Sequence, residues 1–207
     1  MSGTFKINNI ITELQTAANA ARAAGDVLTA LAFEKSIADL KEDLKKVQPL
    51  FAGLTFSTSK ARDLEMDVAK WSLLKPTAIH ATELASVIDC GQNGSITIVS
   101  GAILIKGSIA MQPITALLIA DHAKRNYNGQ GTAFGSQEFM HNIAVANAAT
   151  GTVIEGPQFA EHDKANIHAM ASGWEQMAGR IRAAAPTRPV MRRGNTASIA
   201  MAPEPIA

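Results

Sequence analysis

A β-branched stretch with few charges, near the middle of the chain, constrains the fold more than any other feature. Residues 95–120 read SITIVSGAILIKGSIAMQPITALLIA. Their isoleucines and valines favour extended backbone, and the glycines at 94, 101 and 107 divide the run at spacings too short for a helix. We therefore expect two strands, at 95–100 and 102–110, followed by an apolar helix that begins at Pro113.

The composition indicates one main hydrophobic core. Of the 207 residues, 47% are hydrophobic and 18% are charged, whereas a typical soluble domain has about 25% charged residues. Only seven charged residues lie between positions 76 and 150. A stretch with so few charges must be covered, either by the charged flanks of the same chain or by neighbouring subunits.

Compartment and membrane signals are weak. The chain has one cysteine, Cys90, so no intramolecular disulfide is expected, and the residues after Met1 lack the pattern of a secretory signal. Lys106 and Pro113 interrupt the apolar stretch, so we expect no membrane span. A net charge of +1 gives no general attraction to nucleic acid or to anionic membranes. These features predict a protein made in the cytoplasm.

Residues 1–49 predict a helical hairpin. Asn8 or Asn9 can cap its first helix, and Asp26 can cap the second after a turn at Ala24-Gly25. Apolar residues in the second helix recur at spacings of four and three, which is the pattern of a short coiled-coil seam. The seam consists of Phe33, Ile37, Leu40, Leu44 and Val47. Two interpretations stay open: the hairpin packs on its own domain, or the seam forms a bundle between subunits.

The rest of the chain predicts an α+β fold that is mainly helical, with a small antiparallel sheet around residues 95–110. Residues 50–57 are a candidate for one further strand, and the glycine- and asparagine-rich residues 126–135 are expected to form a flexible loop. Further helices are expected around Leu64–Leu74, over 76–88, from Ser136 to Gly151, and between Pro157 and Pro186. We divide the chain into a hairpin (1–49), a main domain (50–185) and an extended C-terminal arm (186–207).

Three groups of residues could carry chemistry, and each lacks part of its motif. Glu138-x-x-His141 has the spacing used in di-iron helical bundles, but the motif occurs only once. The Gly129–Gly135 stretch has the composition of a phosphate-binding loop, but it follows a predicted helix instead of a strand. Asp121 and His122 are adjacent without a nucleophile motif, and we expect them on the exposed side of their helix. The sequence therefore predicts no catalytic, cofactor or metal site.

The C-terminal arm has two possible partners. Arg188, Arg192 and Arg193 form a basic cluster that could contact the phosphates of a nucleic acid. Ile199 and Met201 have no role in phosphate binding and would suit an apolar groove on a neighbouring subunit. The second interpretation explains more of the arm.

These observations predict a non-enzymatic structural subunit of a homo-oligomeric particle, such as a head, neck or tail component of a virus or phage. The alternatives are a small enzyme or metal- or ligand-binding protein that uses Glu138 and His141 or the Gly129–Gly135 stretch, and a nucleic-acid-binding protein that uses the arm. The predicted subunit-interface residues are Phe33, Ile37, Leu40, Leu44, Val47, Arg188, Arg192, Arg193, Ile199 and Met201.

Overall fold

The chain is an α+β protein built on one mixed sheet. The computed structural model describes residues 2–46, 51–56, 68–156, 161–184 and 197–200. The strands are β1 (Phe51–Thr55), β2 (Ala78–Ala81), β3 (Ala85–Asp89), β4 (Ser95–Val99), β5 (Ala102–Lys106), β6 (Gln130–Phe134), β7 (Val153–Glu155) and β8 (Ala197–Ala200). They lie in the order β7-β6-β1-β5-β4-β3-β2-β8.

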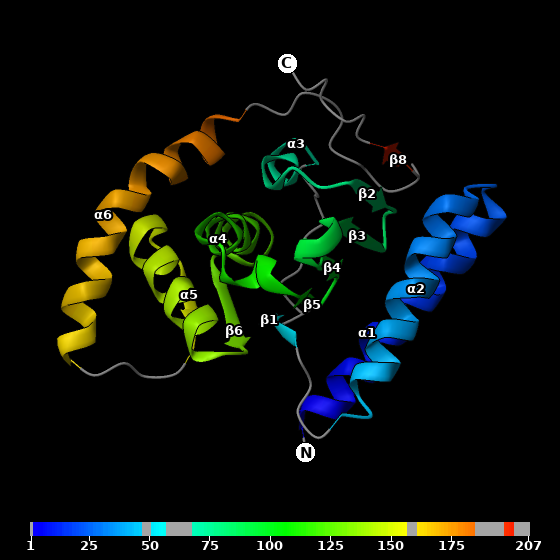
Figure 1. Cartoon of the computed structure of the whole chain (residues 1–207), viewed down its shortest axis with the longest axis horizontal. Helices are drawn as coiled ribbons and strands as arrows, with labels where there is room; N and C mark the ends of the chain where they lie inside the picture. Colours follow the sequence, from blue (N-terminus) through cyan, green and yellow to red (C-terminus); the bar gives the residue numbers. More distant parts are fainter. Residues whose placement is uncertain (1, 47–50, 57–67, 157–160, 185–196, 201–207) are drawn as a thin grey trace.

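Helices cover both faces of this sheet (Figure 1). They are α1 (Ser2–Ala23), α2 (Val27–Asp43), α3 (Val68–Trp71), α4 (Pro113–Tyr127), α5 (Gln137–Thr150) and α6 (Glu161–Ala183), with short 3-10 turns η2 (Ser72–Leu74), η3 (Gly91–Asn93) and η4 (Ser108–Met111). We call the side covered by α1 and α2 the hairpin face, and the side covered by α4, α5 and α6 the α4 face.

The strands from β2 to β5 form an antiparallel meander. β1 adds to β5 and β6 adds to β1, both antiparallel, whereas β7 runs parallel to β6. At the other edge, β8 pairs antiparallel with β2, with Ile199 opposite Ile79. The predicted small sheet was therefore only the centre of a larger one, whose outer strands come from parts of the chain far apart in sequence.

Side chains on the central strands alternate between the two faces of the sheet, and each face has its own hydrophobic core. Ile103 and Ile105 of β5 join the larger cluster on the α4 face, whereas Leu104 between them joins a smaller cluster with α1 and α2. Successive side chains of a strand point to opposite faces, so a run that is apolar at every position is buried on both sides. This explains why the central stretch contains almost no charge.

The predicted helix ends at three positions are confirmed. The Asp26 carboxylate accepts a hydrogen bond from the Thr29 amide at the start of α2, and Ser136 does the same for Phe139 at the start of α5. Gly151 ends α5 with a φ of 68°, a conformation that glycine adopts without strain. Asn8 and Asn9, in contrast, lie inside α1, which begins at Ser2.

The helix predicted over 76–88 is wrong, because this segment forms the β2–β3 hairpin. Its alanines favour a helix, and its apolar residues fit either period. The turn between the strands is fixed by Thr82, whose Oγ1 accepts hydrogen bonds from the amides of Leu84 and Ala85. Pairing of β3 with the strongly extended β4 then outweighs the helical preference.

Two other expectations need correction. The predicted loop at 126–135 contains β6, where Gly131 lies so close to Phe56 that an added Cβ would sit 2.9 Å from its ring. The glycines there permit close strand packing instead of flexibility. The second central strand ends at Lys106, and the 3-10 turn η4 follows it.

The hairpin and the C-terminal strand both contact the central sheet. No helix in the described part of the chain combines the length and the apolar character that a membrane span requires.

Candidate functional site

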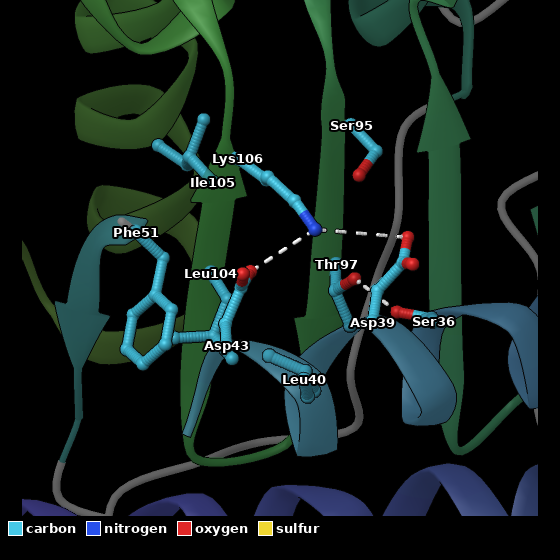
Figure 2. Close-up of a pocket in the computed structure, with 10 residues that line it drawn as sticks. All are labelled: Ser36, Asp39, Leu40, Asp43, Phe51, Ser95, Thr97, Leu104, Ile105 and Lys106. Atoms are coloured by element: carbon cyan, nitrogen blue, oxygen red, sulfur yellow. Dashed lines mark hydrogen bonds and ion pairs between the residues drawn. The ribbon is translucent and has the colours of Figure 1, made fainter. Parts of the chain in front are cut away.

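An ion-pair cluster attaches α2 to the sheet (Figure 2). Lys106 projects from β5 toward α2, where its Nζ lies 3.0 Å from Asp43 Oδ2 and 4.0 Å from Asp39 Oδ2. Lys46 donates a hydrogen bond of 2.6 Å to Asp43 Oδ1. Beside them the hydroxyls of Ser36 and Thr97 are 2.9 Å apart. We call these residues the hairpin anchor.

The anchor holds a buried charge. The Asp43 side chain is 1% exposed, and burial by itself would raise its pKa. Hydrogen bonds from Lys46 and Lys106 outweigh burial, so the pKa of Asp43 is lowered. The cavity beside it has about 20 Å³, little more than one water molecule needs. The anchor therefore joins a helix to a sheet and has no room for an organic ligand.

A hydrogen-bond chain connects α1 to the opposite face of the sheet. Glu13 Oε2 on α1 accepts hydrogen bonds from the Ser100 amide and hydroxyl, at 3.0 and 2.7 Å. The Ser100 carbonyl in turn accepts a hydrogen bond from the Tyr127 hydroxyl on α4. Ser100 lies in the turn between β4 and β5, so this turn is held from both faces.

His122 is buried, contrary to the expectation that it lies on the exposed side of α4. Its side chain has no exposed surface and packs near the rings of Phe56, Trp71 and Tyr127. Burial, with a smaller contribution from Arg125, lowers the pKa of His122 to about 3. Its Nε2 makes no hydrogen bond within the described part of the chain. His122 is therefore neutral at physiological pH.

Asp121 contacts two basic side chains. Lys70 Nζ lies 3.1 and 3.2 Å from its carboxylate oxygens, and Arg125 lies 2.8 Å from Oδ2. The Lys70 pair connects α3 to α4, whereas the Arg125 pair lies within α4. The Lys70 and Asp121 side chains are only 9% and 13% exposed. Asp121 is thus engaged in ion pairs, one of which joins α3 to α4.

Glu138 and His141 line an open hollow at the start of α5, together with Ser136, Gln137, Met111 and, from α6, Asp163. The structure therefore brings a third ionisable side chain to the pair predicted from sequence. Asp121 and His122 do not line this hollow. Among the residues that the structure describes, no three His, Cys, Asp or Glu side chains lie in an arrangement that could hold a metal ion.

The other sequence candidates lie in structural positions. The Gly129–Gly135 stretch is paired with β1 on one side and β7 on the other, so backbone groups that could cradle phosphate are used in the sheet. Cys90 is buried, and burial raises the pKa of its thiol to about 11. A thiol with this pKa is protonated at neutral pH and is a poor nucleophile.

Three residues of the predicted seam, Phe33, Ile37 and Leu40, are buried against α1 and the chain's own sheet. For these side chains to contact another subunit, the hairpin would have to leave the sheet. Leu44 is half-buried, and Ile199 lies in β8. Val47, Arg188, Arg192, Arg193 and Met201 lie outside the described residues.

An exposed apolar surface lies where α1 turns into α2. Val27, Leu28 and Leu31 are 53%, 66% and 49% exposed, and Ala23 and Ala24 beside them are exposed as well. We call these five residues the apolar tip. Sequence reasoning missed it, although the signal was present: the first turns of α2 are apolar on all sides, and a helix of that kind is normally covered all round.

An ion pair fixes the geometry at the base of the tip. Both carboxylate oxygens of Glu34 on α2 accept hydrogen bonds from Arg22 on α1, at 2.7 to 3.1 Å. This ion pair joins the two helices beside the tip. No protein-family model, curated protein or solved structure matches this chain.

Proposed function

We propose that this protein is a non-enzymatic structural subunit that assembles with copies of itself and with neighbouring proteins of a larger particle. The apolar tip is the observation that carries this proposal. Covering a leucine side chain stabilises a contact by about 1.5–3 kcal/mol, and two leucines and a valine lie together at the tip without a charged residue between Ala23 and Leu31 except Asp26. Such a cluster favours association.

Within this class we propose a component of a virus or phage particle, in its head, neck or tail. The support is a chain with only 5% aromatic residues, a helical hairpin that presents an apolar tip, and a C-terminal strand at the sheet edge. Electron micrographs of the purified protein at high concentration test this narrower proposal. Rings, tubes or shells of uniform size are expected, and amorphous aggregates alone would contradict it.

The mass of the protein in solution tests assembly itself. Light scattering across a concentration series should give a mass that rises to a multiple of 21.8 kDa. A mass that stays at one chain at every concentration, in the absence of other proteins, would contradict self-assembly.

The hollow at α5 supports a second candidate function, as a small enzyme or a metal- or ligand-binding protein. Glu138, His141 and Asp163 line one open hollow with two carboxylates and an imidazole, and binding of a metal ion there would require these side chains to move closer together. Metal analysis of the purified protein tests this alternative. A stoichiometric transition metal that is lost in Glu138→Gln but kept in Glu175→Gln, an exposed position on α6, would favour the hollow over a purely structural role.

Nucleic-acid binding through Arg188, Arg192 and Arg193 is the other alternative. Its support is the charge cluster in the sequence. Removal of residues 186–207 should abolish binding, and the affinity of the full chain should fall as salt increases. Binding that survives the deletion would contradict a role for the arm.

A further inference from the structure

The sheet ends at β7 on the side opposite β8, and β7 turns some of its backbone groups outward there. It pairs with β6 in a parallel ladder, and among the strands that the structure describes it has no neighbour on its other side. The Val153 amide donates a hydrogen bond of 2.8 Å to the Gly129 carbonyl, just before β6. Because successive residues of a strand direct their backbone groups to opposite sides, the amide and the carbonyl of Ile154 point away from β6.

The side chain of Asn147, in the last turn of α5, pairs with both outward groups of Ile154. Its Nδ2 donates a hydrogen bond of 2.8 Å to the Ile154 carbonyl, and its Oδ1 accepts one of 3.3 Å from the Ile154 amide. A side-chain amide has the same kinds of donor and acceptor as a peptide group. Asn147 therefore makes the two hydrogen bonds that a residue of a neighbouring strand would make.

The turn between α5 and β7 fixes Asn147 in this orientation. Thr152 Oγ1 donates a hydrogen bond of 2.7 Å to Asn147 Oδ1, so the side-chain nitrogen is the atom that faces the Ile154 carbonyl. The Gly151 amide donates a hydrogen bond of 2.8 Å to the Asn147 carbonyl. Both the backbone and the side chain of Asn147 are thus held by residues that precede β7.

Without Asn147, the outer side of β7 would be a self-complementary edge. Val153 and Glu155, on either side of Ile154, are exposed, Val153 to 69%. Two such edges related by a two-fold axis would place Ile154 opposite Ile154, with each amide donating to the carbonyl of the other copy. Unpaired strand edges of this kind are common sites of association between chains.

We propose that Asn147 closes the β7 edge, so that its side chain prevents the same edge of a second copy from pairing with β7. The observation that carries the inference is the pair of hydrogen bonds between Asn147 and Ile154. In the homo-oligomer proposed above, this closure would direct association to the apolar tip. The closure itself does not depend on that proposal.

Amide hydrogen exchange and light scattering on Asn147→Ala test the closure. Both are measured on the full chain with Leu28→Ser and Leu31→Ser, which removes association through the tip. Compared with this background, Asn147→Ala should speed exchange of the Ile154 amide about tenfold at low protein concentration. The solution mass of Asn147→Ala should rise above that of the background as the concentration increases.

Further variants separate an open edge from general damage. Thr150→Val removes a hydroxyl from the same turn but keeps the contacts of Asn147 with Ile154, so exchange and mass should match the background. Val153→Lys, added to Asn147→Ala, places a charge at the open edge and should return the mass to that of the background. If Asn147→Ala does not fold, Asn147→Asp takes its place, because it keeps the size of the side chain but cannot donate to the Ile154 carbonyl.

Three results would overturn the closure. Exchange of the Ile154 amide that stays slow in Asn147→Ala would show that Asn147 does not cap β7. Fast exchange with a mass that never exceeds the background would show that the open edge does not pair with a second copy. Association that survives Val153→Lys would place the new contact elsewhere. Since every comparison is made with the same background, a failure of the tip proposal changes both masses and leaves their difference to decide the closure.

Discussion

The α4 face of the sheet encloses a histidine that must stay neutral, whereas the hairpin face encloses an aspartate that must stay charged. His122 lies among aromatic rings with its pKa lowered to about 3. Asp43 lies between two lysines that remain 40% and 45% exposed. The α4 face is thus the enclosed core, and the hairpin face is a smaller apolar contact held at its rim by ion pairs.

This difference explains how one molecule can be stable and still present an apolar surface. The cluster on the α4 face contains more of the buried apolar residues than the cluster on the hairpin face. The hairpin is fixed by the anchor and by the Glu13–Ser100 hydrogen bonds, and the residues of its tip belong to neither buried cluster. The predictions that follow test this contrast.

Substitutions at two adjacent residues of β5 allow the stability contributions of the two cores to be compared. Ile103 points to the α4 face and Leu104 to the hairpin face, and both are buried. We expect Ile103→Ala to lower the free energy of unfolding by about 4 kcal/mol and Leu104→Ala by about 2–3 kcal/mol, because the larger cluster is less able to collapse around a cavity. Urea unfolding at neutral pH measures both, and equal losses would contradict the contrast.

His122 should make the protein sensitive to mild acid. The unfolded chain takes up a proton at this histidine near pH 6.5, whereas the folded chain does not until about pH 3. The free energy of unfolding should therefore fall by up to about 1.4 kcal/mol per pH unit between these values.

Urea unfolding from pH 7 to pH 4.5 measures this slope. His122→Phe should remove most of it, whereas His80→Gln should remove less, because His80 is only partly buried and Asp26 and Asp89 oppose the lowering of its pKa. An unchanged slope in His122→Phe would show that other groups cause the acid sensitivity.

Asp43 should contribute more than Asp39, one helical turn earlier, to the free energy of unfolding. Asp43→Asn should lower the free energy of unfolding by about 2 kcal/mol, since a buried charged acceptor loses its hydrogen bonds. Asp39 is 46% exposed and 4.0 Å from Lys106, so Asp39→Asn should cost less than about 1 kcal/mol. Chemical unfolding of the two variants at pH 7 checks the order.

The Asp43 carboxylate also predicts a loss of stability at a pH lower than the one at which His122 acts. Because the folded pKa of Asp43 is lowered, its contribution is complete above the unfolded value of about 3.9 and is lost as the pH falls through the folded value. The difference between the wild type and Asp43→Asn should therefore shrink as the pH falls below the unfolded value. A difference that grows in acid would contradict the ion-pair account.

Elements whose conformation is set by their own local sequence were predictable. The central strands, the cap at Asp26, the cap at Ser136 and the end at Gly151 are each set by local preference. The segments at 76–88 and 126–135 were not, because their conformation depends on pairing with strands elsewhere in the chain. Local periodicity carries no information about such partners.

The candidate sites could likewise be predicted only where their residues are close in sequence. Glu138 and His141 were visible as a motif, but Asp163 joins them only through the packing of α6 on α5. The Asp43–Lys106 pair joins residues 63 positions apart, and no spacing rule finds it. The apolar tip could have been read from Val27, Leu28 and Leu31, had the solvent side of α2 been considered with its seam.

The smallest expected effect on stability belongs to the tip. Leu28→Ser with Leu31→Ser should change the free energy of unfolding by less than about 0.5 kcal/mol in dilute solution, as is usual for surface positions. A large loss would mean that the tip is part of the folding core.

The central claim, that copies meet through the apolar tip, is tested most directly by the solution mass of this same double variant. Light scattering across a concentration series should show that it stays at one chain under conditions where the wild type associates. Lys35→Ser, an exposed change on the same helix, should associate like the wild type. If the double variant forms the same oligomer as the wild type at the same concentrations, the tip is not the contact and the account is wrong.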